Sequence, residues 1–349
     1  MIEWHIIACE YPPQIGGVSS YVASVAGGLG AAGHRVHVWC PRASGPRPEP
    51  PGVAVHAELG RFRPSDLRHV GRMLDAFSGP RRILVQWVPH GYGYRSMNVP
   101  FCLWIRQRAR KGDCVDVMVH EPFLAFAGTW KQKTAAAVHR VMTLILLGAT
   151  RKAWISIPAW RRPLERYARG RQLGFGWLPI PSAVEPIDDP AGAASVRSRY
   201  ASTGDHVVGH FGLHGRLTAR PMKDVVPQLL ARLERVAVLL MGQGSLTLRD
   251  EILSDHPELA PRVHATGALT LPELSRHLQA CDVLVQPYPE GITSRRTSTM
   301  APLAHGKAIV TNEGPASEPL WRARGAVSLV PFSAATPVSV RRSTLAPSV

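Results

Sequence analysis

The chain contains few cysteines, and they follow no metal-binding pattern. Five occur in 349 residues, and none form a CxxC pair. A disulfide framework or a structural zinc site is therefore not expected. Such usage is typical of a reducing compartment, so we predict a cytoplasmic protein without a bound metal.

Long apolar runs are also missing. The amino terminus, MIEWHIIACEYPP, lacks the cationic start and the extended apolar segment of a signal peptide. The most apolar stretch, 141–149, is shorter than the ~20 residues that span a bilayer. We expect a buried helix leading into a strand across 135–157, and a helix lying on a membrane surface is the alternative.

Acidic residues are scarce relative to basic ones. The chain has 41 Lys and Arg against 25 Asp and Glu, which gives a net charge of +16. This excess favours phosphorylated ligands, an acidic membrane surface or nucleic acid, although a solvated basic surface explains it equally well. Neither a helix-turn-helix pattern nor an aromatic and basic platform is present, so nucleic acid is not expected as a partner.

Apolar strand-like segments alternate with segments of helical periodicity, which indicates parallel sheets flanked by helices. A Pro-rich passage at 178–195 separates two such sets. We predict two Rossmann-like, doubly wound α/β domains at 1–183 and 184–349. Ligands of such sheets bind beyond the carboxyl ends of the strands, so we expect the two domains to face each other across a cleft. We expect a buried strand followed by a loop in EWHIIACEYPP at 3–13. The further expected strands are 35–41, 81–88, 115–120, 152–157, 206–212, 235–245, 262–267, 281–290, 307–314 and 325–331.

Three stretches of the first half are candidate ligand contacts. Gly16 and Gly17 lie between a strand end and a helix, where glycine lets a ligand approach the backbone, although a tight turn is the simpler interpretation. His120 ends an apolar strand and could contact a substrate, or be a core histidine. The aromatic segment containing His90 and Tyr92 could line an acceptor groove, or be a packed loop.

The second half carries phosphate-binding chemistry at strand ends. A basic segment after the strand 206–212 contains Arg216, Arg220 and Lys223, which we expect in a loop before a helix. Cations between a strand end and a helix suit a diphosphate, because helix N-termini leave backbone N–H groups unpaired. A solvated loop is the alternative, and the GQG turn at Gly242 is weak evidence alone.

The stretch EGITSRRTSTMAPLAHGKAIVT at 290–311 is the strongest anion candidate. It carries hydroxyls and two adjacent arginines where a strand leads into a helix. Arginine binds phosphate through two parallel hydrogen bonds, and an exposed basic loop is the alternative interpretation. The candidate residues are Thr293, Ser294, Arg295, Arg296 and Ser298.

The order and spacing of four segments resemble glycosyltransferase family 4, which has the GT-B fold. They are YPPQIGGVSSYVASVAGGLGAAGHRVHVW, VHEP, WLPIPSAVEP and the region from TGALTLPELSRHL through LAHGKAIVTNEG. The resemblance implies that Gly16 and Gly17 face the donor diphosphate and that His120 contacts the transferred sugar. It implies that Arg216 or Arg220 pairs with Lys223 as the basic pair, and that Glu290 is the first Glu of the family signature.

The sequence departs from the family in two places. The second signature Glu falls on Ser298 or Ala301, depending on the direction of counting, so neither candidate is acidic. The GITSRRTS segment resembles a form found in one bacterial subgroup and could compensate by adding phosphate donors. After 325–331 the family's closing helices, one of which crosses back to the first domain, are not recognisable, so we expect them to be lacking.

The family implies a retaining hexosyltransferase that moves a sugar from a nucleotide-diphosphate sugar to an acceptor hydroxyl, with no cofactor and no essential metal. We expect a role in bacterial polysaccharide, glycolipid or glycoconjugate biosynthesis. The acceptor is a glycan, a glycolipid or a small molecule, and peripheral contact with an anionic membrane at the inner face is left open. The alternative is a catalytically weak or inactive relative that binds a sugar nucleotide or a partner protein.

Overall fold

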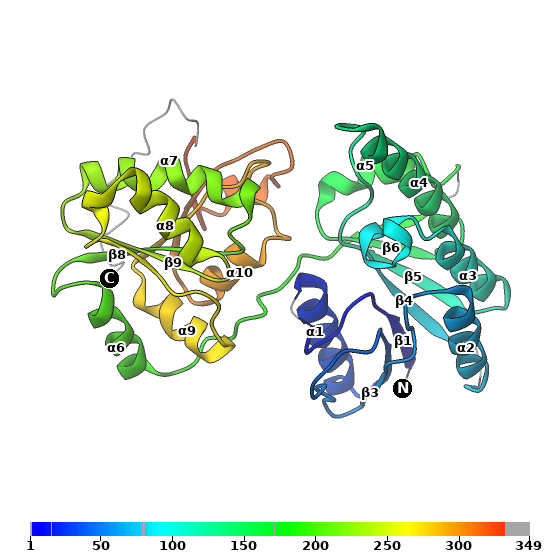
Figure 1. The fold of residues 1–349 in the computed structure, drawn as a ribbon. Helices are drawn as coiled ribbons and strands as arrows, with labels where there is room; N and C mark the ends of the chain where they lie inside the picture. Colours follow the sequence, from blue (N-terminus) through cyan, green and yellow to red (C-terminus); the bar gives the residue numbers. More distant parts are fainter. Residues whose placement is uncertain (1, 15, 79–80, 171, 332–349) are drawn as a thin grey trace. The chain divides into compact units, whose positions relative to one another are not determined.

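The computed structural model describes residues 2–14, 16–78, 81–170 and 172–331, with only the backbone for 216–218. The chain divides into two compact units, Met1–Pro179 and Ile180–Val349 (Figure 1). The division lies between 179 and 180, whereas the predicted boundary lies between 183 and 184. The prediction that closing helices are lacking concerns residues outside the described part of the chain.

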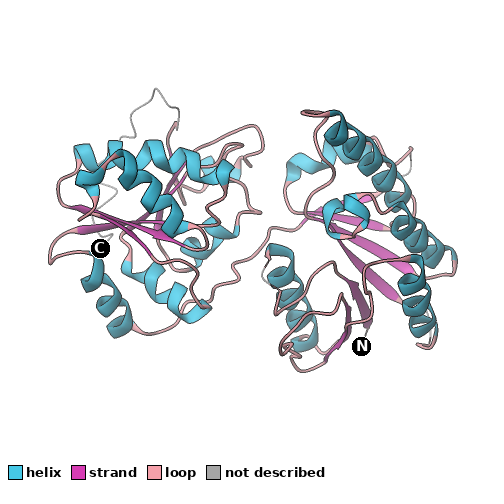
Figure 2. Ribbon diagram, viewed as in Figure 1, coloured by secondary structure: helices cyan, strands magenta, loops and turns pink. Residues whose placement is uncertain are grey.

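The first domain is built on a seven-stranded parallel sheet in the order β3-β2-β1-β4-β5-β6-β7. Its central strands β4 and β5 are apolar and nearly continuously buried, as expected for a parallel sheet covered on both faces. Figure 2 shows the helices on either side of the sheet. The strands are β1 Glu3–Ile7, β2 Arg35–Trp39, β3 Val53–His56, β4 Arg82–Trp87, β5 Cys114–Val119, β6 Lys152–Ile155 and β7 Gly174–Trp177. The α-helices are α1 Gly17–Ala31, α2 Pro64–Asp75, α3 Val99–Arg110, α4 Trp130–Leu147 and α5 Arg161–Glu165.

The second domain repeats this architecture with six parallel strands in the order β10-β9-β8-β11-β12-β13. Separate apolar clusters pack against the two faces of its sheet. The strands are β8 His206–Phe211, β9 Val236–Met241, β10 Val263–Ala265, β11 Val283–Gln286, β12 Ala308–Thr311 and β13 Ser328–Leu329. The helices are α6 Pro190–Tyr200, α7 Arg216–Arg232, α8 Ser245–Asp255, α9 Leu271–Ala280, α10 Thr297–Ala304 and α11 Leu320–Ala323.

Each sheet has one point at which the strand order reverses. In the first domain β1 pairs with both β2 and β4, and in the second β8 pairs with both β9 and β11. Ligands of doubly wound sheets bind beyond the carboxyl ends of the strands at such a point. The loops that follow these strands are therefore the places to look for a site. The prediction of two doubly wound α/β domains is confirmed.

Within the described residues, no helix combines the length and apolar character needed to cross a bilayer. The same part of the chain contains no cluster of three or more His, Cys, Asp or Glu side chains arranged to hold a metal ion.

Candidate functional site

In the second domain, the loops after β8 and β9 touch through their backbones. His214 donates its backbone N–H to the carbonyl of Gln243 at 3.0 Å, and Gly212 donates to Met241 at 3.1 Å. Gly242 has φ +110°, and a side chain there would collide with the carbonyl of Gly212. Gly242 is therefore required by a close backbone approach, and this approach places the start of α8 beside the loop after β8.

The loop after β11 holds a shared ion pair. Glu290 accepts hydrogen bonds on the same carboxylate oxygen, Oε1, from Arg295 at 2.8 Å and from Arg296. The Arg296 guanidinium also lies over the Tyr288 ring, 4.9 Å from its centroid. Both arginine side chains are mostly buried, with about a fifth of their surface exposed. Two cations share one carboxylate, so this loop carries a net positive charge.

A second carboxylate, Glu318, also holds this loop in place through hydrogen bonds. It is 3% exposed and accepts a hydrogen bond from the Ser294 backbone N–H at 3.0 Å and from the Ser294 hydroxyl at 2.5 Å. It also accepts from the Trp321 indole N–H at 2.7 Å. The buried carboxylate therefore fixes the backbone immediately before the two arginines. The sequence analysis missed Glu318, whose only signal is an acidic residue within the short segment before α11.

The beginning of this loop is fixed by a close crossing with the segment after β12. Asn312 accepts from the Tyr288 N–H at 2.7 Å and donates to the Tyr288 carbonyl at 2.8 Å. Gly291, at φ +86°, crosses Gly314 so closely that a side chain on either would collide with the other segment's backbone. Asn312 was also missed, because its partner lies 24 residues earlier in the chain.

Helix α10 begins directly after the arginines. The hydroxyls of Ser298 and Thr299 in its first turn each lie 2.7 Å from the Tyr288 hydroxyl. A side chain at Gly212 would lie 3.9 Å from Cβ of Ser298, so the loop after β8 reaches the start of α10. Thr293 is fully buried, and its hydroxyl has no hydrogen-bond partner in the described part of the chain. Gly212, Gly242, Glu290, Arg296 and Ser298 thus belong to one cluster of loops at the carboxyl edge of the sheet.

The basic segment after β8 differs from the expected loop. Helix α7 begins at Arg216, so Arg220 and Lys223 lie within the helix rather than before it. The Lys223 ammonium lies 2.6 Å from a carboxylate oxygen of Glu251 on α8. Arg220 is exposed, and the Arg216 side chain lies outside the described residues. A diphosphate contact by Lys223 would have to compete with Glu251, and the role of this segment stays a prediction.

In the first domain, a carboxylate already occupies the start of α1. The Glu10 side chain accepts a hydrogen bond from the Ser19 backbone N–H at 2.8 Å, within the first turn of the helix. A side chain at Gly16 would collide with this carboxylate, whereas Gly17 has open space around it. A negative charge is stabilised at this position by the unpaired N–H groups of the helix start. The sequence analysis did not predict this contact for Glu10.

His120 lies at the carboxyl end of β5 and is neutral. Its Nε2 donates to the Gln86 amide oxygen at 2.9 Å, and its ring packs edge-on against Tyr21 of α1 at 4.8 Å between centroids. Burial lowers the pKa of His120 to about 3. Tyr21 brings α1 and His120 together, so the predicted glycine loop and histidine are neighbours in this domain. A neutral ring with Nε2 protonated leaves Nδ1 as an acceptor for a hydroxyl.

The predicted acceptor residues lie in different environments. Tyr92 is fully buried, stacks between Trp87 and Phe101 and donates its hydroxyl to the Gln86 carbonyl. The groove-lining interpretation of Tyr92 is therefore wrong, and the alternative of a packed aromatic loop holds for it. The His90 side chain is 56% exposed, with Nδ1 3.6 Å from the Glu121 carboxylate, so an acceptor contact there stays a prediction.

Comparison with known proteins agrees with this architecture. Residues 15–173 match the sequence model of Glycosyltransferase Family 4. Among proteins with curated functions, no sequence matches significantly.

Solved structures resemble the chain over most of its length. Sucrose-phosphate synthase from Thermosynechococcus elongatus has a TM-score of 0.69 at 15% identity, over 96% of this chain and 87% of that one. WaaG, a glycosyltransferase of lipopolysaccharide biosynthesis, gives 0.63 at 13% identity, over 95% and 87%. Anabaena HepE in complex with UDP and glucose gives 0.60 at 14% identity, over 90% and 81%. Residues 15–173 are therefore similar to glycosyltransferase family 4, and the chain as a whole has the GT-B fold.

Proposed function

We propose that the protein transfers a sugar from a nucleotide-diphosphate sugar to an acceptor hydroxyl, with retention of anomeric configuration. The observation that carries this proposal is the Arg295–Glu290–Arg296 cluster at the start of α10, beside the glycine turn that leads into α8. Cleavage of the bond between sugar and phosphate builds negative charge on the leaving diphosphate. Fixed guanidinium groups and helix N–H groups stabilise such charge without reorganising.

The shared carboxylate suggests how the donor is received. Glu290 is 38% exposed and offers one oxygen to two guanidinium groups. A diphosphate offers more oxygens and more charge, and arginine binds it bidentately. On donor binding, the arginines would exchange Glu290 for the diphosphate, and Glu290 would then bind sugar hydroxyls. Thr293 and Ser294 would keep the loop backbone in place.

His120 would contact the sugar as a hydrogen-bond acceptor. Its lowered pKa keeps the ring neutral at physiological pH. It would therefore act by orienting a hydroxyl rather than by carrying positive charge. Gly17 at the start of α1 leaves room beside the backbone for a phosphate. Such a phosphate would compete with the Glu10 carboxylate, which accepts a hydrogen bond from the Ser19 backbone N–H.

The second candidate function is a sugar-nucleotide-binding protein with weak or no transfer activity. It is favoured by Ser298, which stands at one candidate position for the second signature Glu and lies within hydrogen-bond distance of Tyr288. The family's usual acidic contact to the ribose is then missing, and donor identity stays open. The acceptor is a glycan, a glycolipid or a small molecule, in bacterial polysaccharide, glycolipid or glycoconjugate synthesis.

The first experiment is thermal denaturation with UDP, GDP, ADP and dTDP, followed by sugar-nucleotide hydrolysis with the base that stabilises the chain most. Stabilisation with hydrolysis supports the transferase. Stabilisation without hydrolysis or transfer supports the binding protein. No stabilisation by any of the four nucleotides contradicts both.

The diphosphate contacts are tested by Arg295→Ala and Lys223→Ala. Each should lower turnover ten-fold or more, since loss of one transition-state donor costs ~2.7–4 kcal/mol. Glu251→Gln is the matched control for Lys223, because it breaks the same ion pair and leaves the ammonium in place. Equal effects of Lys223→Ala and Glu251→Gln would show that the lysine only joins α7 to α8.

A further inference from the structure

A pocket of about 460 Å³ lies between α2 and α3 of the first domain. Its lining residues belong to α2, to α3 or to Lys111, which directly follows α3. The volume is in the range of small-molecule binding sites. None of the lining residues is predicted to contact the sugar donor or the acceptor, so a ligand here would occupy a separate site.

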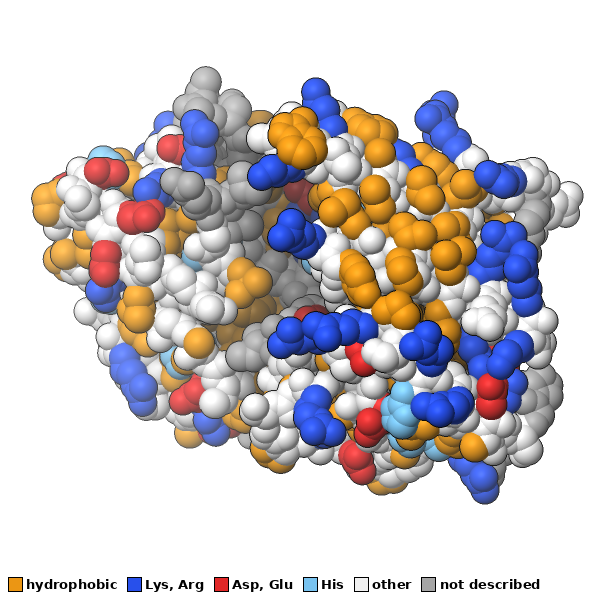
Figure 3. Space-filling view, turned by 45° about the vertical axis from the view of Figure 1, so that its right-hand side comes forward, with side chains coloured by type: hydrophobic (Ala, Val, Ile, Leu, Met, Phe, Trp, Pro, Cys, Tyr) orange, Lys and Arg blue, Asp and Glu red, His pale blue; other side chains and the backbone are white. Residues whose placement is uncertain are grey.

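The pocket is strongly basic. Its charged lining residues are the cations Arg68, Arg72, Arg108 and Lys111 and the anion Asp75, which gives the lining a net charge of +3. Figure 3 turns the side of the first domain that carries α2 and α3 forward, and Lys and Arg are frequent on it whereas Asp and Glu are sparse. The surrounding surface therefore does not neutralise the pocket, and an anionic ligand is favoured.

The two arginines of α2 have no acidic partner. Arg68 and Arg72 lie one turn apart, are exposed and form no ion pair with any described residue. The acidic side chains of the helix are engaged elsewhere, since Asp66 accepts from backbone N–H groups before the helix and Asp75 pairs with α3. Like charges at this spacing destabilise a helix, and an anion bound to both arginines would remove that cost.

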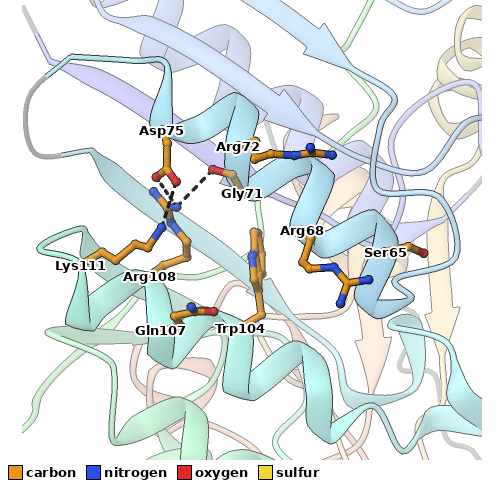
Figure 4. A pocket seen from close by; sticks show the side chains of 9 residues that line it. All are labelled: Ser65, Arg68, Gly71, Arg72, Asp75, Trp104, Gln107, Arg108 and Lys111. Carbon is orange, nitrogen blue, oxygen red and sulfur yellow. Dashed lines mark hydrogen bonds and ion pairs between the residues drawn. The ribbon is translucent and has the colours of Figure 1, made fainter.

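Arg108 brings a buried cation to the same pocket. Its side chain is 2% exposed, and its Nε donates to Asp113 at 2.5 Å. Its Nη1 donates to Asp75 at 2.6 Å and to the Gly71 carbonyl at 3.3 Å (Figure 4). Its Nη2 is buried and has no hydrogen-bond partner in the described part of the chain. An unpaired buried donor is costly and indicates an acceptor that the polypeptide does not supply.

Trp104 adds an apolar wall and a further donor. Its side chain is 8% exposed, and Figure 4 shows the indole between α2 and α3. Gly71 leaves room for it, because a Cβ at this position would lie 3.3 Å from the indole nitrogen. The indole N–H forms no hydrogen bond with any described residue. Ser65 and Gln107, which also line the pocket, can hydrogen-bond to hydroxyl groups.

We propose that the pocket between α2 and α3 binds a small, soluble phosphate monoester whose other part is a hydroxylated ring, such as a sugar phosphate. Arg68 and Arg72 bind the phosphate from α2, Arg108 Nη2 gains an acceptor, and Trp104 and Gln107 contact the ring. A phosphate monoester carries a charge of about −1.5 to −2 at pH 7, which balances the pocket better than a carboxylate does. Arginine binds phosphate through two parallel hydrogen bonds.

The recessed shape of the site favours a small molecule over a flat partner surface, because Arg108 and Trp104 are almost fully buried. Only a ligand that enters between the helices reaches both of them. The proposal does not depend on the transferase function.

The test is calorimetric titration and thermal denaturation of the full chain with ribose 5-phosphate, inorganic phosphate and ribose. Ribose 5-phosphate should bind most tightly, inorganic phosphate more weakly and ribose not measurably. The thermal midpoint should rise with the concentration of ribose 5-phosphate, because a ligand of the folded state stabilises it by mass action.

The two arginines of α2 are tested by Arg68→Gln/Arg72→Gln. This variant should bind ribose 5-phosphate about a hundred-fold less, because each hydrogen bond to a charged group contributes about ten-fold. Without ligand it should be at least as stable as the parent, because a repulsive pair has been removed. The matched control is Arg106→Gln/Arg110→Gln, which removes two exposed arginines one turn apart on α3 that do not line the pocket. The control should bind as the parent does.

The outcomes that overturn the proposal are specific. No binding of either phosphate probe, or an equal loss in the control, removes the anion site. Ribose 5-phosphate that binds no more tightly than inorganic phosphate removes the ring from the assignment. Binding to phosphatidylcholine vesicles that contain phosphatidic acid, with neither soluble phosphate bound, would assign the pocket to a lipid headgroup instead.

A last variant separates this pocket from the donor loop of the second domain. Arg295→Ala should weaken nucleotide binding and leave the affinity for ribose 5-phosphate unchanged. An equal loss of both would place the sugar phosphate in the donor loop and would overturn the proposal. Loss of nucleotide binding in the parent protein would contradict the proposed function and leave this result standing.

Discussion

Replacement of Glu318 by alanine should disrupt the loop after β11, which carries Arg295 and Arg296. Glu318 itself is not predicted to contact the donor. Glu318 is buried and accepts hydrogen bonds from three donor groups: the Ser294 backbone N–H, the Ser294 hydroxyl and the Trp321 indole N–H. The Ser294 hydroxyl can rotate toward another partner. The Ser294 backbone N–H and the Trp321 indole N–H would remain buried without an acceptor.

The expected loss follows from those two donors. A buried donor left unpaired costs about 1–3 kcal/mol, so the two donors together should lower the free energy of unfolding of Glu318→Ala by about 2–6 kcal/mol. That is a large part of the ~5–15 kcal/mol that stabilises a typical protein. Glu318→Gln keeps one acceptor oxygen and should cost less. Glu313→Gln breaks only the exposed pair with Arg322 and should cost below about 1 kcal/mol.

The assay combines urea denaturation with calorimetric titration of the nucleotide diphosphate that stabilises the parent protein most. We expect the order Glu318→Ala, Glu318→Gln, Glu313→Gln for loss of stability, and nucleotide affinity at least ten-fold lower in the first. If Glu318→Ala unfolds within about 1 kcal/mol of the parent and binds nucleotide equally well, the buried carboxylate does not organise the loop and the reasoning is refuted.

Two further predictions concern acid stability and the loop crossing. Burial lowers the pKa of His5, His120 and His210 to about 3 each, below the ~6.5 of the unfolded chain. The unfolded chain therefore binds more protons below pH 6.5, and stability falls from there toward pH 3, by about 2 kcal/mol per histidine at pH 5. Urea denaturation at pH 7.5 and 5 measures it, and an unchanged midpoint would contradict buried neutral histidines. Asn312→Ala should lower the free energy of unfolding by about 1–3 kcal/mol and weaken nucleotide binding, because Tyr288 loses a donor and an acceptor for its backbone; Asn312→Asp, which keeps the acceptor, should recover part of the loss in both measurements.

Much of the fold could be predicted because buried parallel strands are continuous apolar runs. The strands β4, β8, β9 and β11 fall within the expected ranges for this reason, and β5 begins one residue before its expected range. The strands β3 and β7 were missed, because both lie at sheet edges, and β7, GFGW, contains two glycines. Such short segments carry little periodicity, so only pairing with a neighbouring strand defines them.

The candidate site was predictable only where its chemistry is local in sequence. Arg295 and Arg296 next to a helix start indicate an anion site from composition alone. Glu10, Asn312 and Glu318 act on backbone groups up to 24 residues away, and nothing in their own segments specifies that partner. The start of α7 was also misplaced. Pro221 lies inside this helix, where it lacks the N–H that an interior position normally donates.

The crossing of Gly291 and Gly314 has a consequence for reading mutational scans. In a saturation library selected for activity, both positions should reject every substitution, because any side chain would force two backbones apart. Gly17, which has open space around it, should accept alanine even though it faces the predicted donor. A glycine that rejects every substitution in such a scan would then mark a place where two backbone segments cross. A glycine that accepts alanine could still lie next to the substrate.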